Sequence, residues 1–290
     1  MKFSGINSFN VNTYRNNNLQ TMMKHIPFNK TAYNAPVINL ASNIGSKEQI
    51  TNMNTRVINS VIPLNIYQTW YTKNLPPKMN KAVNYIKINN PEFNYELFDD
   101  NDCREFIKNN FEQNILNAYD SLIPGAYKAD LWRYCILYKK GGIYLDIKYV
   151  PVFNFKFINL IDKEYWVLDR NKKGIYNALL VCLPGNQILW RAINEIAYNV
   201  KTKFYGNDSL SPTGPNLLSK YFTDVEKSQF NMYHNYVDTI DNRYITMYNK
   251  IIFISYKGYL SEYALSQELK PDKKEPHYGI LWQTKRIYKN

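Results

Sequence analysis

Apolar and polar positions between residues 127 and 148 predict a helix, a sharp turn and a buried strand in succession. The helical face repeats every three to four residues and comprises Ala129, Trp132, Ile136 and Leu137. Lysines at 139–140 and glycines at 141–142 follow, and both predict the end of the helix. Cations are favourable at the negative end of the helix dipole, and glycine readily adopts the positive φ of a residue that terminates a helix. Residues 143–145 are β-branched, aromatic or aliphatic, which favours a buried strand ending at Asp146.

Charged residues on these two elements are the first candidates for chemistry. A carboxylate at the C-terminal end of a strand lies where open α/β sheets bind ligands, and Asp146 has that position. Asp130 and Arg133 are three residues apart in the helix, so their side chains share one surface and hold an anion beside a cation.

The rest of the chain predicts alternating strands and helices. Strands are expected at 61–70, 95–98 and 165–168, helices at 77–87, 102–110, around 115 and at 187–201, and a hairpin at 244–248 and 251–255. The second of these helices is expected to begin with a capping box between Asp102 and Glu105. The alternation predicts an α/β fold with a mainly parallel sheet. Residues 1–56 lack sustained periodicity, so we interpret them as a partly irregular N-terminal extension before one domain at 57–290.

Composition limits the class of protein. The chain of 290 residues is 45% hydrophobic and 16% aromatic, which excludes general disorder and allows one sizeable core. Cys103, Cys135 and Cys182 are widely spaced and form no CxxC pair. They suggest neither a disulfide framework nor a zinc site, and a reducing compartment is the simpler expectation.

Charge and hydropathy indicate which partners to expect. The formal net charge is +12, but the lysines are scattered and never form a run of more than two, so we expect no nucleic-acid partner. There is no apolar span of about 18 residues and no secretory leader pattern. We therefore expect no integral membrane segment and a cytoplasmic location, including the cytosol of a virus-infected or bacterial host cell. The oligomeric state is left open.

The helix-Gly-Gly-strand segment resembles the sugar-nucleotide signature of glycosyltransferase family 32. It is more distantly similar to the large clostridial glucosylating toxins, in which the segment ends in Asp-x-Asp. Supporting segments follow the family's order at 62–70, 90–98, 177–180, 213–215 and 277–282. The resemblance implies a GT-A type, Rossmann-like nucleotide-sugar-binding domain with a mainly parallel mixed sheet.

One position departs from the family pattern, because Lys148 replaces the second aspartate. An Asp-x-Asp pair on a strand aims two oxygen groups at one divalent cation, and lysine cannot ligate a metal. The Lys148 ammonium could contact the diphosphate directly and supply part of that positive charge. Alternatively, Lys148 faces solvent while Asp146, His277 and water hold Mn²⁺ or Mg²⁺, or catalysis has been lost.

The resemblance assigns roles to the polar candidates. Asp130 would accept hydrogen bonds from sugar or ribose hydroxyls, and Arg133 would contact the sugar or the diphosphate; a plain surface ion pair is the alternative. Asp146 would be a metal or diphosphate-side ligand, or else a structural cap at the end of a strand. Asn177 matches a polar residue near the acceptor side of the donor sugar, or else it is an ordinary buried amide.

Aromatic residues and a histidine complete the candidate site. Tyr67 and Trp70 lie on the first expected strand, where the resembling families stack an aromatic ring on the nucleotide base; a core tryptophan is the alternative. His277 fits a C-terminal segment that closes over the diphosphate, with Trp282 as part of the lid, or else it is a surface histidine.

The resemblance to this family implies a retaining glycosyltransferase. It would move a hexose from a UDP- or GDP-sugar to an acceptor hydroxyl on a glycan or protein. The alternative is a catalytically silent protein of the same fold that binds a sugar nucleotide or a glycan.

Overall fold

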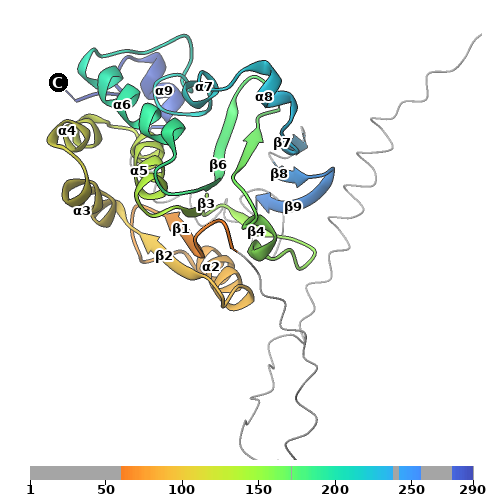
Figure 1. Ribbon diagram of the computed structural model, residues 1–290. Helices are drawn as coiled ribbons and strands as arrows, with labels where there is room; N and C mark the ends of the chain where they lie inside the picture. Colours follow the sequence, from red (N-terminus) through yellow and green to blue (C-terminus); the bar gives the residue numbers. More distant parts are fainter. Residues whose placement is uncertain (1–59, 171, 238–241, 256–275, 290) are drawn as a thin grey trace, which may run out of the picture. The chain divides into compact units, whose positions relative to one another are not determined.

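The computed structural model describes residues 60–170, 172–237, 242–255 and 276–289, so the expected N-terminal extension lies outside the described residues. Its strands form one mixed sheet with the order β2-β1-β3-β6-β5-β7-β8-β9-β4 (Figure 1). The strands are β1 Asn65–Thr69, β2 Asn94–Phe98, β3 Gly142–Leu145, β4 Tyr149–Pro151, β5 Tyr165–Leu168, β6 Ile175–Cys182, β7 Met232–Val237, β8 Asn242–Met247 and β9 Lys250–Ser255. The helices are α2 Pro77–Asn89, α3 Asp100–Asn110, α4 Gln113–Ser121, α5 Gly125–Lys140, η2 Phe157–Leu160, α6 Gln187–Lys201, α7 Pro215–Ser219, α8 Asp224–Ser228 and α9 Tyr278–Gln283.

The α/β class and the mixed sheet are confirmed, but the expectation of a mainly parallel sheet is wrong. Among the described strands, β1 pairs in parallel with β2 and β3, and β5 pairs in parallel with β7. The other pairings are antiparallel. The reason is the length of the connections: those between β5 and β6 and between β8 and β9 are too short for a crossover helix.

Two hydrophobic layers cover the sheet. One layer joins α3, α4, α5, α6 and α7 to one face, and the other packs α2 and η2 against the opposite face. Figure 1 shows α5 beside α6 on one side and α2 on the other. Strand β3 contributes to both layers, because Tyr144 packs with the first and Ile143 and Leu145 with the second.

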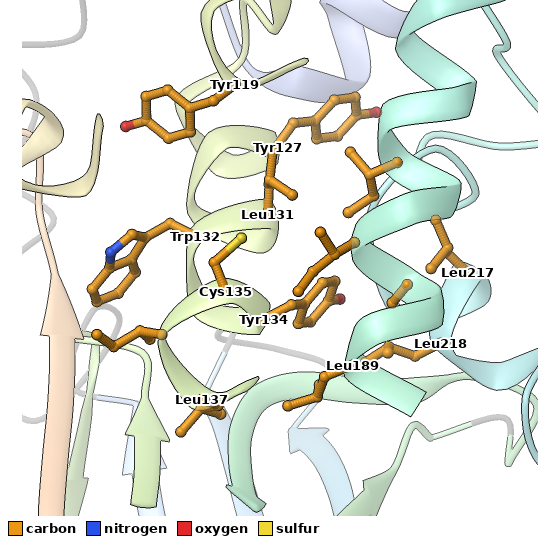
Figure 2. Packing of buried hydrophobic residues seen from close by; sticks show 14 of the residues in the cluster. Tyr119, Tyr127, Leu131, Trp132, Tyr134, Cys135, Leu137, Leu189, Leu217 and Leu218 are labelled. Atoms are coloured by element: carbon orange, nitrogen blue, oxygen red, sulfur yellow. The ribbon is translucent and has the colours of Figure 1, made fainter. Parts of the chain in front are cut away.

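Helix α5 is buried on several sides, which fixes the side chains that it carries. Figure 2 shows Trp132 and Leu131 projecting from different sides of this helix, with Leu189 on the neighbouring helix α6. Trp132, Tyr134 and Cys135 are all 0% exposed. A polar side chain on such a helix therefore lies inside the protein and needs partners there.

The turn after α5 confirms the predicted glycine stop. Gly141 and Gly142 have φ of 62° and 115°. A Cβ on Gly142 would lie 2.7 Å from the carbonyl oxygen of Asn65 in β1. Glycine is therefore required both for the backbone conformation and for the close approach of β3 to β1.

Two smaller expectations are corrected or met. The capping box at the start of α3 joins Asp99 to Asp102, not Asp102 to Glu105, because the helix begins earlier than expected. The late hairpin is confirmed, with Tyr248 and Asn249 at positive φ in its tight turn. In the part of the chain that the structure describes, no helix combines the length and apolar character needed to span a bilayer.

Candidate active site

Asp146 lies directly after β3 at the centre of a network of charged groups. Its backbone N–H donates to the carbonyl of Ala178 in β6 at 2.7 Å. Carboxylate Oδ1 accepts from the Tyr144 hydroxyl at 2.7 Å and lies 3.1 Å from Arg133 Nη1, while Oδ2 lies 2.9 Å from Lys148 Nζ. Burial by itself would raise the pKa of Asp146, but the charges of Lys148 and Arg133 outweigh it and hold the pKa below its usual value.

Arg133 ties helix α5 to the sheet. Its Nη1 donates to the carbonyl of Asn177 in β6 at 2.7 Å, and its Nε donates to the Ala129 carbonyl at 3.1 Å. The guanidinium also lies 4.3 Å from the centre of the Tyr144 ring. With 6% of the side chain exposed, this arginine is a buried clamp, so the surface ion pair considered as its alternative is excluded.

Asp130 is enclosed by donors one turn earlier on α5. Oδ1 accepts from Asn177 Nδ2 at 2.9 Å and Oδ2 accepts from Thr213 Oγ1 at 2.8 Å, while Arg133 Nη2 lies 3.4 Å away. Asn177 also donates to the Tyr134 hydroxyl at 2.7 Å. Burial raises the pKa of Asp130 above its usual value despite the nearby Arg133 charge. Asp130 and Asn177 therefore form one rigid polar unit at the cavity wall.

Two cavities meet at this network. The larger, of about 770 Å³, is lined by Asp130, Asn177 and Gly214, and the smaller, of about 400 Å³, by Thr69, Trp70 and Tyr71. Ala126, Arg133, Asp146, Lys148 and Tyr278 line both cavities. A ligand that extends into both cavities would thus have its middle part beside Asp146 and Lys148, so a polar or charged group is favoured there.

The far side of the larger cavity holds residues that the sequence analysis missed. Asp169 follows β5, and its Oδ1 lies 2.8 Å from Nδ1 of His234 on β7. The imidazole stacks on the Tyr176 ring at 3.7 Å, and burial lowers the pKa of His234 against the opposing effect of Asp169. Arg170, Tyr236 and Arg243 also line this side. The rule that identified Asp146, a carboxylate at the end of a strand, applies equally to Asp169.

Of the four remaining candidates, Trp70 and His277 line the smaller cavity, whereas Tyr67 and Trp282 line neither cavity. Trp70 is half-buried at the wall of the smaller cavity, and its Nε1 has no partner among the described residues. Tyr67 is 0% exposed in the hydrophobic layer under α5 and lines neither cavity, so the structure gives no support to contact with a cofactor.

His277 lines the smaller cavity, but its Nδ1 caps α9 by accepting from Gly279 N–H at 3.1 Å. Trp282 lines neither cavity and donates to the Tyr205 carbonyl at 2.6 Å. This tryptophan anchors α9, while Tyr278 and His277 face the cavities.

A divalent cation does not fit the donors around Asp146. In the described part of the chain, no group of three or more His, Cys, Asp or Glu residues could hold a metal ion. Both oxygens of Asp146 already face cationic side chains. An Asp-x-Asp sequence does occur at residues 100–102, but it opens α3, where Asp102 completes the capping box and pairs with Lys73 at 2.6 Å.

Comparison with known families shows which class of proteins this site resembles. Residues 76–167 match the family described as a glycosyltransferase sugar-binding region containing a DXD motif. The match includes α5, β3 and Asp146. This part of the chain is therefore similar to a glycosyltransferase sugar-binding region, and the predicted resemblance is confirmed.

Several curated relatives are mannosyltransferases. Inositol phosphoceramide mannosyltransferase 3 of Schizosaccharomyces pombe is 32% identical over 163 residues, which are 55% of this chain and 44% of that protein. Inositol phosphoceramide mannosyltransferase 2 of the same yeast is 26% identical over 202 residues, 68% of this chain and 57% of that protein. An uncharacterized glycosyltransferase of Acanthamoeba polyphaga mimivirus is 42% identical over 93 residues, 31% of this chain and 37% of that protein. The chain thus spans about half the length of these relatives.

Among solved structures, the PaToxG glycosyltransferase is similar over 55% of this chain and 67% of its own, with a TM-score of 0.43 and 18% identity. The glycosyltransferase domain of the YGT toxin is similar over 50% of this chain and 65% of its own, with a TM-score of 0.36 and 10% identity.

Proposed function

We propose that this protein transfers a hexose, and specifically mannose, from a nucleoside diphosphate sugar to an acceptor hydroxyl. The observation that supports this most strongly is the position of Asp146, Lys148 and Arg133 between two cavities within a sugar-binding family match. The nucleoside would occupy the smaller cavity against Trp70, the diphosphate would meet the charged network, and the sugar would lie beside Asp130 and Asn177. Mannose is proposed because several relatives are named as mannosyltransferases.

The residues divide the work of transfer between them. Asp130 accepts hydrogen bonds from sugar hydroxyls and fixes the orientation of the ring. Lys148 and Arg133 stabilise the negative charge that develops on the diphosphate as the bond from the anomeric carbon to the phosphate oxygen breaks. The acceptor oxygen then bonds to that carbon, and its proton passes to the departing phosphate oxygen.

We further propose that the anomeric configuration is retained. Each described carboxylate of the larger cavity is held by neighbouring donors: Asp130 by Asn177 and Thr213, Asp146 by Tyr144 and Lys148, and Asp169 by His234. This favours positioning roles over nucleophilic attack, and it supports a mechanism in which donor and acceptor react on the same face of the sugar.

A donor panel tests the proposal. GDP-mannose, other GDP-sugars and UDP-sugars are incubated with the full chain and with acceptors bearing glycan, protein or phosphoinositol hydroxyls, beside Asp146→Ala. We expect release of nucleoside diphosphate and formation of a glycosylated product with one donor, both lost in the variant. Proton NMR of the product then gives its anomeric configuration. Donor binding without turnover under all conditions would identify the silent binding protein instead.

A further inference from the structure

We infer that the ammonium of Lys148 takes the place of the divalent cation at this site, so that the protein binds its nucleoside diphosphate without a metal. This inference rests on the proposed function and concerns the chemistry of the same site. It identifies Lys148 as a residue that contacts the diphosphate and the protein as a metal-independent member of a DXD-containing class.

The first support is the occupied coordination sphere of Asp146. Lys148 Nζ lies 2.9 Å from Oδ2, and Arg133 Nη1 lies 3.1 Å from Oδ1. A Mg²⁺ or Mn²⁺ ion binds a carboxylate oxygen at about 2.1 Å. On either oxygen, such an ion would therefore lie no more than roughly 5 Å from a fixed cation, where like charges repel strongly in a partly dry site.

A second support is the charge already present in the larger cavity. Its described lining contains four permanent cations, Arg133, Lys148, Arg170 and Arg243, and three carboxylates, Asp130, Asp146 and Asp169. Each carboxylate has close hydrogen-bond donors within the protein. Cationic side chains thus line the cavity before any metal binds, as the binding of a diphosphate anion requires.

The surroundings of Lys148 keep its ammonium in place and accessible. Nζ lies 5.7 Å from the centre of the Tyr149 ring and 6.0 Å from that of the Tyr176 ring, and the hydroxyls of these tyrosines are 2.8 Å apart. The side chain is 28% exposed and lines both cavities. An ammonium has three donor hydrogens, so a bond to Asp146 leaves it able to donate to a phosphate oxygen as well.

Calorimetry tests the inference without relying on turnover. MnCl₂ alone is titrated into the full chain, and GDP and UDP are titrated with EDTA and separately with Mn²⁺. Three variants accompany the wild type. Lys148→Met removes the ammonium, Lys148→Asp restores an Asp-x-Asp pair, and Lys140→Met makes the same change at an exposed lysine that lines neither cavity. Thermal unfolding confirms that each variant is folded.

We expect the wild type to bind one nucleoside diphosphate equally well with EDTA and with Mn²⁺. Lys148→Met should raise its Kd roughly 10- to 100-fold, as for a lost hydrogen bond to a charged group, whereas Lys140→Met should leave it unchanged. Lys148→Asp should bind the nucleotide well only with Mn²⁺. Wild-type binding that requires Mn²⁺, or an unchanged Kd in Lys148→Met, would overturn the inference while leaving the proposed function intact. Absence of nucleotide binding in every condition would overturn both.

Discussion

Replacing Arg133 with methionine removes the side chain that joins α5 to β3 and β6. Methionine is unbranched and of similar length, so it keeps much of the apolar contact. It loses the bonds to the Asn177 carbonyl at 2.7 Å and to Asp146 at 3.1 Å. The substitution therefore tests whether the network is a buried structural unit as well as a ligand site.

The expected loss of unfolding free energy comes from the two groups that lose Arg133 as a partner, the Asp146 carboxylate and the Asn177 carbonyl. Breaking a buried ion pair costs about 3–5 kcal/mol, but Asp146 keeps Lys148 and Tyr144 as partners, so the lower end applies. The Asn177 carbonyl loses a charged donor, which adds about 1 kcal/mol. We expect a total of about 4 kcal/mol, a large fraction of the roughly 5–15 kcal/mol that stabilises a typical domain.

Urea unfolding of the full chain at pH 7.5 measures this loss. The Arg133→Met, Asp146→Asn and double variants form a cycle, and we expect a coupling energy of roughly 1–3 kcal/mol between the two side chains. Arg104→Met is the matched control, because Arg104 pairs with Asp120 at 2.7 Å on the surface and its loss should cost far less. A loss below about 1 kcal/mol for Arg133→Met, or additive effects in the cycle, would refute the reasoning.

Four further outcomes are expected. Trp70→Ala should weaken nucleotide binding by about 1–3 kcal/mol in calorimetry, and an unchanged Kd would place the base elsewhere. Asp130→Asn should abolish transfer, because an amide keeps one acceptor oxygen where Asp130 offers two to Asn177, Thr213 and the sugar hydroxyls; unaltered turnover would contradict its role. Gly142→Ala should lower the unfolding free energy by more than about 1 kcal/mol, because its φ is 115°; an unchanged value would count against that strain. The pKa of His234 is lower in the folded state than in the unfolded state, so the free energy of unfolding should fall as the pH drops below about 6.5. In urea titrations at pH 7 and pH 5, His234→Gln should show a smaller difference in this free energy than the wild type does.

Local chemistry explains what could be predicted from the sequence. The end of α5 was predicted because lysines and two glycines act on their immediate neighbours, and Gly141 and Gly142 indeed have positive φ. Asp146 was identified as a site residue because the end of a strand is a position that sequence alone can specify. Its partners Asp130 and Arg133 were identified on the same helix.

Long-range pairing explains what could not be predicted. Strand β6 is buried along its whole length, so it lacks the alternation that marks a half-exposed strand. Asp169 and His234 are 65 residues apart and meet only because β5 and β7 are neighbours. Tyr67 and Trp282 lie close in sequence to Trp70 and His277, which line the smaller cavity, but their own side chains line neither cavity. The boundary at residue 56 and the cytoplasmic location remain predictions.

A crystal structure of the full chain with the nucleoside diphosphate that binds in EDTA tests the central claim most directly. The account predicts the base in the smaller cavity against Trp70 and a phosphate oxygen within hydrogen-bond distance of Lys148 Nζ, beside Asp146. A nucleotide bound away from the junction of the two cavities, or a diphosphate that leaves Lys148 and Arg133 untouched, would contradict it.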